Sequence, residues 1–483
     1  MHPDDREALA AKRICCNCVR EDFLRAEIAS DGAVALCDYC GDDEEKTWSI
    51  GDVADSVEQA FENHYARTAT EADPSDYYLY ADRDFGRTWY RDGQETAEAI
   101  QEATRTPEDA AADVQALLGD RYDDVESARM GEETEFAPDA RYDFKGTDAA
   151  DWHREWMSFE NALKTEARFF SRSGAEHLAA TFNGIDELAT TDGSPLVVEA
   201  GPQRPLDHLY RARVFQSDAK LIEALCRPDL HLGSPPVALA SAGRMNARGI
   251  SVFYGATGAS TAIAEVRPPV GSKVAVARFA ITRPLRLLDL TVLDKVNDDG
   301  SIFDPTLKRR LERVSFLRTL GQRITRPVMP DDEAFDYLAT QAIADFLATE
   351  SEPRLDGVIF SSAQSKDGRN VVLFHKAARV AELDLPPGTV VEADTHYDTD
   401  EGPETDYRVS EVVPPATPPA PDEHFHPMLF RFNPPDPFDG DFRDNTLQVE
   451  PGSVEVHHVN WVAFDCTAHG VTRHRREKRE PKF

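Results

Sequence analysis

The spacing of hydrophobic residues divides the chain into a helical first part and a strand-rich second part. Apolar side chains recur every three or four residues at 52–66 and again at 150–170, as they do in amphipathic helices. In the second stretch the repeating residues are Trp152, Trp156, Phe159, Leu163, Ala167 and Phe170. A third helix is predicted at 331–348, where one face carries Phe335, Leu338, Ala342 and Phe346.

Short apolar runs that are typical of strands begin at about residue 195. They lie at 195–200, 251–256, 273–281, 285–290, 357–360 and 370–374. Because these strands are interrupted by a long helix only once, we expect an α+β fold rather than a regular parallel α/β arrangement. A last apolar run, at 459–466, predicts one more strand near the C-terminus.

These patterns predict four parts of the chain. A small cysteine-containing module occupies 1–45, and a mainly helical region follows at 46–195. The strand-rich domain covers 196–380, and an acidic, Pro-rich extension with short strands occupies 381–483. Within that extension, residues 386–437 hold 12 of the 31 prolines, which excludes a continuous helix or a central strand there.

The acidic composition indicates where the protein works rather than what it does. The 483 residues carry 53 Lys and Arg against 88 Asp and Glu, which gives a net charge of −35. The acidic residues are spread along the chain, and Lys is scarce, with 12 against 41 Arg. Concentrated salt screens such self-repulsion, because the Debye length falls to about 3 Å at 1 M. The composition is therefore typical of a salt-rich cytoplasm such as that of haloarchaea, and it argues against bulk nucleic-acid binding.

The chain also lacks the sequence signals of a membrane or secreted protein. No apolar run reaches the roughly 20 residues that a membrane-spanning helix needs. The N-terminal residues are polar and do not resemble a secretory signal. We therefore expect a cytoplasmic protein that makes no contact with a membrane.

Four of the seven cysteines form two CxxC pairs, Cys15–Cys18 and Cys37–Cys40. Two thiolates in such a pair can bind one metal ion from a tight turn, and a second pair completes a tetrahedral shell. The spacing predicts a structural zinc site of the ribbon or knuckle type, since four thiolates leave no open coordination position. Cys16 is an alternative to Cys15 with a shift of one residue. Two pairs of redox or idle thiols are the other interpretation.

Three segments of the strand-rich domain carry a combined sequence pattern. They are LYRARVF at 209–215, GRMNARGISVFYGATGASTAIAEVR at 243–267 and DGVIFSSAQSKDGRNVVLF at 356–374. Together they resemble the RES domain, a family named for an arginine, a glutamate and a serine, over about residues 205–380. That family supplies toxins of bacterial and archaeal toxin–antitoxin systems, which degrade NAD or transfer ADP-ribose.

The resemblance implies an ADP-ribosyltransferase-like fold at 196–380 that binds NAD as its substrate. The upstream four-cysteine segment and helices resemble an N-terminal region that some of these proteins carry and that also occurs beside HEPN-type ribonuclease domains. The family therefore implies a toxin or abortive-infection effector, with an antitoxin or a sensor protein as a candidate partner. An oligomer is compatible with the resemblance, which does not specify the oligomeric state.

The resemblance also assigns individual residues to the site. The implied catalytic residues are Arg211, Tyr254, Glu265 and Ser362. The implied NAD-binding residues are Arg211, Arg244, Asn246, Tyr254 and Ser362. Met245 stands where the family has an aromatic residue. Ser361 is an alternative to Ser362 as the site serine. Asn370 also matches a family position, but the resemblance assigns it no role.

These residue types suit cleavage of the nicotinamide–ribose bond of NAD. Positive charge develops on the ribose as the bond breaks, and the carboxylate of Glu265 can stabilise that charge. The guanidinium groups of Arg211 and Arg244 can grip the diphosphate through paired hydrogen bonds. Tyr254 can stack on nicotinamide or adenine, and Ser362 can hydrogen-bond to the nicotinamide amide or to a phosphate.

The local charge supports binding of an anion independently of the family. Residues 204–278 contain ten Lys and Arg against five Asp and Glu, although the whole chain carries −35. Local positive potential can concentrate an anionic dinucleotide against a repulsive exterior.

Several alternatives remain open at this point. The acceptor can be water, phosphate, or a protein or nucleic acid, which would make the enzyme a glycohydrolase, a phosphorylase or an ADP-ribosyltransferase. Arg172 and His177 fit the loose Arg–His motif of HEPN-type ribonucleases on a predicted helix. A non-catalytic, zinc-containing sensor or scaffold is the third function. Taken singly, Arg211 and Glu265 fit solvated charges, and Tyr254 fits a core position.

Overall fold

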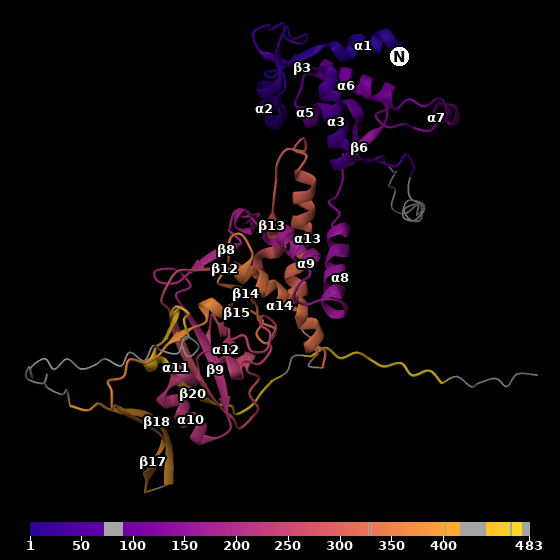
Figure 1. The fold of residues 1–483 in the computed structure, drawn as a ribbon. Helices are drawn as coiled ribbons and strands as arrows, with labels where there is room; N and C mark the ends of the chain where they lie inside the picture. The colour runs from indigo at the N-terminus through magenta and orange to yellow at the C-terminus, as the bar shows by residue number, and fades with distance from the viewer. Residues whose placement is uncertain are drawn as a thin grey trace, which may run out of the picture. The chain divides into compact units, whose positions relative to one another are not determined.

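The chain folds into two compact units. The computed structural model describes residues 1–71, 90–326, 328–329, 331–400, 402–415, 441–463 and 466–475 (Figure 1). The first unit is Met1–Leu196 together with Val292–Ile324, and the second is Val197–Thr291 together with Thr325–Phe483. Within the described residues, no helix combines the length and the apolar character that a membrane crossing requires.

The N-terminal part of the first unit is a small antiparallel sheet with helices around it. Its elements are α1 (Pro3–Ala11), β1 (Arg13–Cys15), α2 (Asp22–Asp31), β2 (Ala33–Val34), β3 (Lys46–Ser49) and α3 (Ile50–His64). The strands pair in the order β1-β3-β2. The start of α3 is fixed by a capping box, in which the side chains of Ser49 and Asp52 bond to each other's backbone amides.

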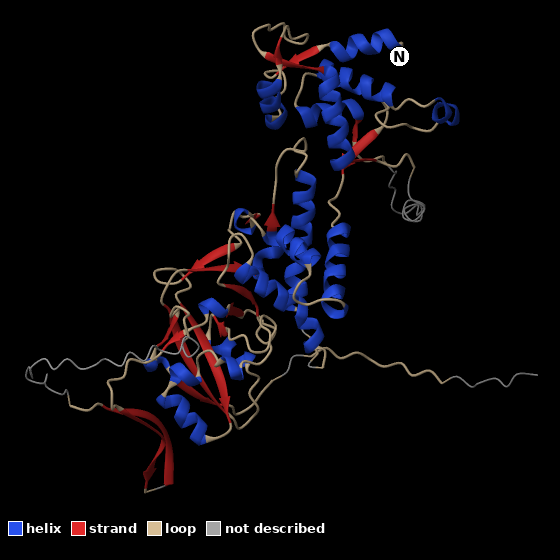
Figure 2. Cartoon of the chain, in the orientation of Figure 1, coloured by secondary structure: helices blue, strands red, loops and turns tan. Residues whose placement is uncertain are grey.

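The rest of the first unit is mainly helical, as the sequence predicts (Figure 2). Buried side chains of α2, α3, α5 and α6 belong to one hydrophobic core. The remaining elements are β4 (Tyr65–Arg67), β5 (Gln94–Glu95), α5 (Thr96–Thr104), α6 (Glu108–Arg121), α7 (Val125–Met130), β6 (Arg141–Phe144), α8 (Ala150–Thr165), α9 (Arg172–Phe182), the 3-10 helix η1 (Ile185–Glu187), β7 (Ala189–Thr190), β13 (Val296–Asn297) and α13 (Leu307–Thr325).

The helix predicted at 150–170 is confirmed as α8 over most of its length. Trp152, Trp156, Phe159 and Leu163 are all buried, as their spacing indicates. The helix ends before the last two predicted positions, so the prediction is wrong there. As a result, Phe170 is 97% exposed rather than part of the core.

The second unit is built on a ten-stranded sheet, and the six strands predicted between 195 and 374 are all confirmed. The order is β16-β19-β11-β9-β10-β15-β14-β12-β8, and β20 pairs with a further stretch of β11. The elements up to α14 are β8 (Val197–Ala200), β9 (His208–Phe215), α10 (Asp218–Cys226), α11 (Pro228–His231), η2 (Val237–Leu239), β10 (Phe253–Ala256), α12 (Ala259–Glu265), β11 (Lys273–Ile281), β12 (Leu285–Asp289), η3 (Leu290–Lys295) and α14 (Glu333–Thr349). The later ones are β14 (Gly357–Ser361), β15 (Arg369–Leu373), η4 (His375–Ala377), β16 (Val380–Ala381), β17 (Val390–Thr399), β18 (Gly402–Val412), β19 (Leu447–Val449), η5 (Pro451–Ser453) and β20 (Glu455–His458).

The register of four adjacent strands brings distant segments of the sequence together. β10 pairs with β9 at Ala256 and Tyr210, and with β15 along its length. β15 lies between β10 and β14, so Asn370 is opposite Ala256 on one side and Phe360 on the other. Because α12 starts directly after β10, its last residue, Glu265, reaches the side chain of Asn370.

The helix predicted at 331–348 is confirmed as α14, but its buried face differs from the predicted one. Phe346 is buried as predicted, together with Ala339, Ile343 and Leu347. Leu338 and Ala342 are only half-buried, and Phe335 is 56% exposed. Phe335 lies in the first turn of the helix, and the buried residues of α14 begin only at Ala339. The first turn therefore leaves its side chain exposed.

The C-terminal part of the second unit adds strands to the main sheet. β19 and β20 both pair with β11, while β17 and β18 form a separate hairpin. The prediction of a strand at 459–466 is wrong, because residues 459–463 form no strand and Trp461 is 77% exposed. The pairing segment is β20, which lies just before it. Of the Pro-rich stretch, residues 416–440 lie outside the described residues.

The core of the second unit can be tested at Phe279 on β11. This residue is fully buried and meets Phe253 edge to face, with 5.0 Å between the ring centroids. Phe279→Ala should lower the free energy of unfolding by about 3–5 kcal/mol, because it removes apolar contacts and leaves a cavity. Phe442→Ala, at a position that is 81% exposed, should have little effect. Chemical denaturation followed by circular dichroism would contradict this account if both variants were equally stable.

Candidate active site and metal centre

A cavity of about 410 Å³ lies in the second unit. Side chains of β9, β10, β14 and β15, of α12 and α14, and of the turn before β10 line it. Most of the residues that the sequence assigns to NAD lie here. Those in the lining are Arg211, Arg244, Tyr254 and Glu265, joined by Ser361 and Asn370.

Glu265 is held by two hydrogen bonds to the same carboxylate oxygen. Oε1 accepts the hydroxyl of Ser362 and the Nδ2 group of Asn370, the latter at 2.7 Å. No described residue hydrogen-bonds to Oε2, and the side chain is exposed. The arrangement fixes the orientation of the carboxylate and leaves one oxygen available to a ligand.

The two serines at the end of β14 have different surroundings. The hydroxyl of Ser362 donates to Glu265 and accepts the backbone amides of Gln364 and Ser365, both at 3.1 Å. Its hydrogen-bonding capacity is therefore used within the protein, and it is not among the cavity-lining residues. Ser361 is exposed and lines the cavity. The geometry gives Ser362 a positioning role and leaves Ser361 free to meet a ligand.

Asn370 has a clear place in the site, although the sequence assigned it no role. Its side chain is 5% exposed, and Nδ2 donates to Glu265. The other end of the amide, Oδ1, is buried and has no hydrogen-bond partner among the described residues. A polar residue that opens the apolar run 370–374 is the signal that could have indicated this role from the sequence.

Arg211 brings a buried positive charge to the cavity. Its guanidinium lies over the ring of Phe253, 4.9 Å from the centroid, and Nη1 has no hydrogen-bond partner among the described residues. Burial, together with the nearby charge of Arg213, lowers the pKa of Arg211 to about 10. The group is still cationic at neutral pH, so the cavity holds a charged donor whose hydrogen bond is unmade.

Tyr254 and Asn246 hold the turn that precedes β10. The hydroxyl of Tyr254 donates to Oδ1 of Asn246 at 2.9 Å and accepts the backbone amide of Met245 at 3.0 Å. Burial raises the pKa of Tyr254 to about 12, despite the opposing effect of the Met245 amide. Asn246 is buried and does not line the cavity. Only the ring of Tyr254 is therefore available to a ligand, and Asn246 acts as a turn former.

Two further cavity residues, Tyr337 and Glu333, come from α14, which carries no motif. Tyr337 of α14 lies under the guanidinium of Arg244, at 5.0 Å from Cζ to the ring centroid. Arg244 also donates to the backbone carbonyl of Arg326 at 2.9 Å. Glu333 and Arg267 line the same cavity. Sequence reasoning missed Tyr337 and Glu333, because only the packing of α14 against the turn brings them there.

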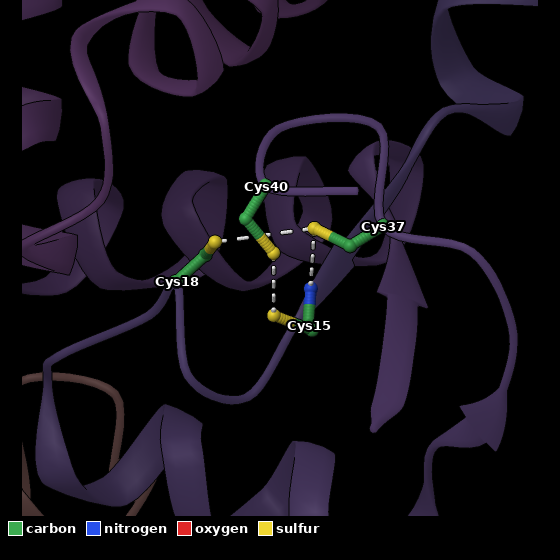
Figure 3. A group of neighbouring side chains, drawn as sticks. All are labelled: Cys15, Cys18, Cys37 and Cys40. Carbon is green, nitrogen blue, oxygen red and sulfur yellow. Dashed lines mark hydrogen bonds between the residues drawn. The ribbon is translucent and has the colours of Figure 1, made fainter. Parts of the chain in front are cut away.

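The four predicted metal ligands form one cluster in the first unit. Figure 3 shows the side chains of Cys15, Cys18, Cys37 and Cys40 turned toward one another. Their sulfur atoms all lie within 4.8 Å of one another, with Cys15 3.6 Å from Cys40 and Cys18 3.9 Å from Cys37. In a tetrahedral thiolate shell with metal–sulfur distances of about 2.3 Å, neighbouring sulfurs are about 3.8 Å apart. The cluster therefore has the dimensions of a four-thiolate metal site.

Cys16 lies outside this cluster. Its Sγ donates to Oε2 of Glu45 at 3.4 Å, and the side chain packs in the hydrophobic core of the first unit. The alternative of Cys16 as a ligand in place of Cys15 is therefore removed by the structure.

His177, which fits the HEPN motif, is a core residue of the first unit. It is 7% exposed and packs against the rings of Trp152, Trp156 and Phe316. Burial lowers its pKa, although Glu155 beside Nδ1 acts in the opposite direction. Arg172 is exposed at the start of α9. The aromatic enclosure of the imidazole gives no support to a role in RNA cleavage.

Comparison with known families identifies the domain that holds the cavity. Residues 209–400 match the family model of the RES domain, so the resemblance noted in the sequence is confirmed for this range. The match covers Arg211, Glu265, Ser362 and Asn370. RES domains are generally associated with enzymes that act on NAD. No curated protein and no solved structure is similar enough to the chain to be matched.

The turn before β10 can be tested at Gly243. A Cβ atom at this position would lie 2.6 Å from the hydroxyl of Tyr254 and 2.7 Å from Oδ1 of Asn246. Gly243→Ala should therefore break their hydrogen bond and destabilise the unit by about 1–3 kcal/mol. Gly452→Ala is the matched control in the same unit, since a Cβ there meets nothing within 4 Å. Equal melting temperatures for the two variants would contradict this description of the turn.

Proposed function

We propose that the protein is an NAD-consuming enzyme that cleaves the nicotinamide–ribose bond. The observation that carries this proposal is the carboxylate of Glu265. It is fixed through Oε1, keeps Oε2 available, and lines the same cavity as the unpartnered Nη1 of Arg211. A fixed carboxylate and an unsatisfied cationic donor are what a positively charged transition state and an anionic diphosphate require.

The proposed reaction needs only groups that the cavity contains. The bond between C1′ and the pyridinium nitrogen breaks with its electron pair going to nicotinamide, which leaves as a neutral molecule. Glu265 stabilises the oxocarbenium-like ribose that remains. Arg211 and Arg244 bind the diphosphate, and the ring of Tyr254 gives the nicotinamide or adenine an apolar surface. Water or a hydroxyl acceptor then bonds to C1′ and releases its proton to the solvent, whereas a phosphate dianion bonds through an anionic oxygen without losing a proton.

Three acceptors are compatible with this site. Water gives a glycohydrolase and phosphate gives a phosphorylase, while a protein or nucleic-acid group gives an ADP-ribosyltransferase. We propose, with the RES family, an ADP-ribosyltransferase-like fold and a role as a toxin or defence effector, because loss of NAD would stop the metabolism of the cell. An antitoxin or sensor protein is the partner that such a role requires. The net charge of −35 supports a site of action in concentrated salt.

We further propose that the four-cysteine cluster binds a structural zinc ion. The sulfur spacing fits a closed tetrahedral shell, which leaves no position for substrate or water. Cys15, Cys18, Cys37 and Cys40 would hold the ion, which would tie β1 to the loop between β2 and β3. In this role the metal supports the folding of the N-terminal module and takes no part in NAD chemistry.

The central test is release of nicotinamide from NAD. Purified protein in molar salt should release it, and Glu265→Gln should reduce kcat on the order of 10³-fold. This substitution keeps an oxygen that can accept from Ser362 and Asn370 and removes only the charge. Chromatography of the products with water, phosphate and protein acceptors would identify the reaction.

The matched control is Glu223→Gln, on the exposed surface of α10 in the same unit. It should cleave NAD at the rate of the unmodified protein. Absence of nicotinamide release under every acceptor and salt condition would refute the proposed function and favour a non-catalytic sensor or scaffold.

The metal proposal predicts one zinc ion per chain. After dialysis against a chelator, Cys37→Ser should retain little zinc and should melt at a lower temperature, because three thiolates hold the ion less firmly. Cys16→Ser should keep the full zinc content, since its thiol lies outside the cluster. Metal analysis that finds equal zinc in the two variants would contradict the assignment.

A further inference from the structure

Asn370 is a buried polar side chain whose hydrogen bonding is incomplete. It is 5% exposed, it lines the cavity, and only one end of its amide is hydrogen-bonded. The orientation of the amide is fixed by chemistry, because an ionised carboxylate only accepts hydrogen bonds. The nitrogen must therefore face Glu265, and Oδ1 is the end without a partner.

An unsatisfied buried acceptor of this kind calls for an explanation. Leaving such a group without a donor costs free energy in the folded state, so each one in a native protein needs a reason, such as a catalytic role or a bound molecule. Asn370 also stands at the start of a strand whose next residues, Val371, Val372 and Leu373, are fully buried and apolar. The bond to Glu265 accounts for the nitrogen end of the amide, and a ligand would account for the oxygen end.

A second open acceptor lies beside the first. Oε2 of Glu265 has no hydrogen bond from the described residues, and Oε1 of the same carboxylate is 2.7 Å from Nδ2 of Asn370. Since the oxygen and nitrogen of one amide are about 2.3 Å apart, Oδ1 lies within roughly 5 Å of this carboxylate. Two neighbouring acceptors call for a ligand with two neighbouring donors.

The part of NAD that fits this pair is the diol of the nicotinamide ribose. The 2′ and 3′ hydroxyls sit on adjacent carbons and are each able to donate one hydrogen bond. If Glu265 acts at C1′, these hydroxyls are the nearest donors of the substrate. The carboxamide of nicotinamide is attached to C3 of the pyridine ring, two bonds from the nitrogen that leaves, so it lies farther from C1′ than the 2′ hydroxyl does.

We propose that Asn370 is a specificity-determining residue that accepts a hydrogen bond from a hydroxyl of the nicotinamide ribose. This inference rests on the proposed function and names the part of the substrate that Asn370 recognises. Oδ1 accepts the hydroxyl while Nδ2 keeps Glu265 in place. Because Oδ1 is closed to water in the present conformation, side chains of the cavity wall must shift as the sugar enters. The site then selects a ribose over a deoxyribose.

The test combines a change in the enzyme with a change in the substrate. kcat/KM for nicotinamide release is measured with NAD and with analogues that lack the 2′ or the 3′ hydroxyl of the nicotinamide ribose. The readout is the preference for NAD over each analogue, because removal of the 2′ hydroxyl also alters the intrinsic reactivity of the bond. Asn370→Ala should reduce the preference for one of the two hydroxyls by about tenfold or more. If Asn370 had only a structural role, Asn370→Ala would lower kcat/KM for NAD and for both analogues by the same factor. The preference for NAD over each analogue would then stay unchanged.

A second variant separates the two ends of the amide. Asn370→Asp keeps an acceptor at Oδ1 but places a second carboxylate against Glu265, where the two repel each other or share a proton. It should therefore be slower than the unmodified enzyme and should still prefer the hydroxylated substrate. The control substrate is an NAD analogue with a carboxylate in place of the carboxamide. Asn370→Ala should not change the preference for NAD over this analogue.

The outcomes distinguish this inference from the proposed function. If the unmodified protein releases no nicotinamide from NAD, the proposed function has failed. If it does release nicotinamide, but Asn370→Ala leaves both hydroxyl preferences unchanged, or Asn370→Asp loses the preference, the inference on Asn370 is overturned. A changed preference for the carboxamide alone would also overturn it, in favour of recognition of the nicotinamide ring.

Discussion

The hydrogen bonds that Ser362 and Asn370 make to Oε1 of Glu265 are the constraint around which the candidate site is organised. Glu265 ends a short helix and is exposed, so its own element does not fix the direction of its carboxylate. The two donors come from segments about a hundred residues later in the chain. Only the sheet order β10-β15-β14 brings them to the end of α12. The sheet therefore determines where the charge is placed and which oxygen a ligand can reach.

The rest of the cavity complements this fixed carboxylate. Arg211 contributes a buried cation with an unmade hydrogen bond, and Tyr254 uses its hydroxyl to hold the Gly243 turn that carries Arg244. In the proposed function, this arrangement places positive charge for the diphosphate near negative charge for the ribose. Of the ten basic residues at 204–278, Arg211, Arg244 and Arg267 line the cavity. Only part of the local positive charge therefore belongs to the site.

Sequence reasoning predicted the elements that a strong hydrophobic pattern defines, and it did less well where packing decides. The strands at 273–281 and 357–360 and the helix with Trp152 and Trp156 follow directly from their spacing. The strand at 459–466 fails because an apolar run alone does not say which segment finds a free edge of β11. In the site, the family pattern indicated Glu265 and Ser362. The hydrogen bonds of Asn370 and Asn246, and the stacking of Tyr337 under Arg244, depend on contacts across the fold.

The most direct test of the central claim is a crystal structure of the Glu265→Gln variant with NAD. This variant keeps the hydrogen bonds that orient position 265 and should bind the substrate without consuming it. The account predicts NAD in the cavity, with the nicotinamide ribose against position 265 and Asn370, and with the diphosphate against Arg211. An empty cavity at saturating NAD, or NAD bound at another place on the protein, would contradict it.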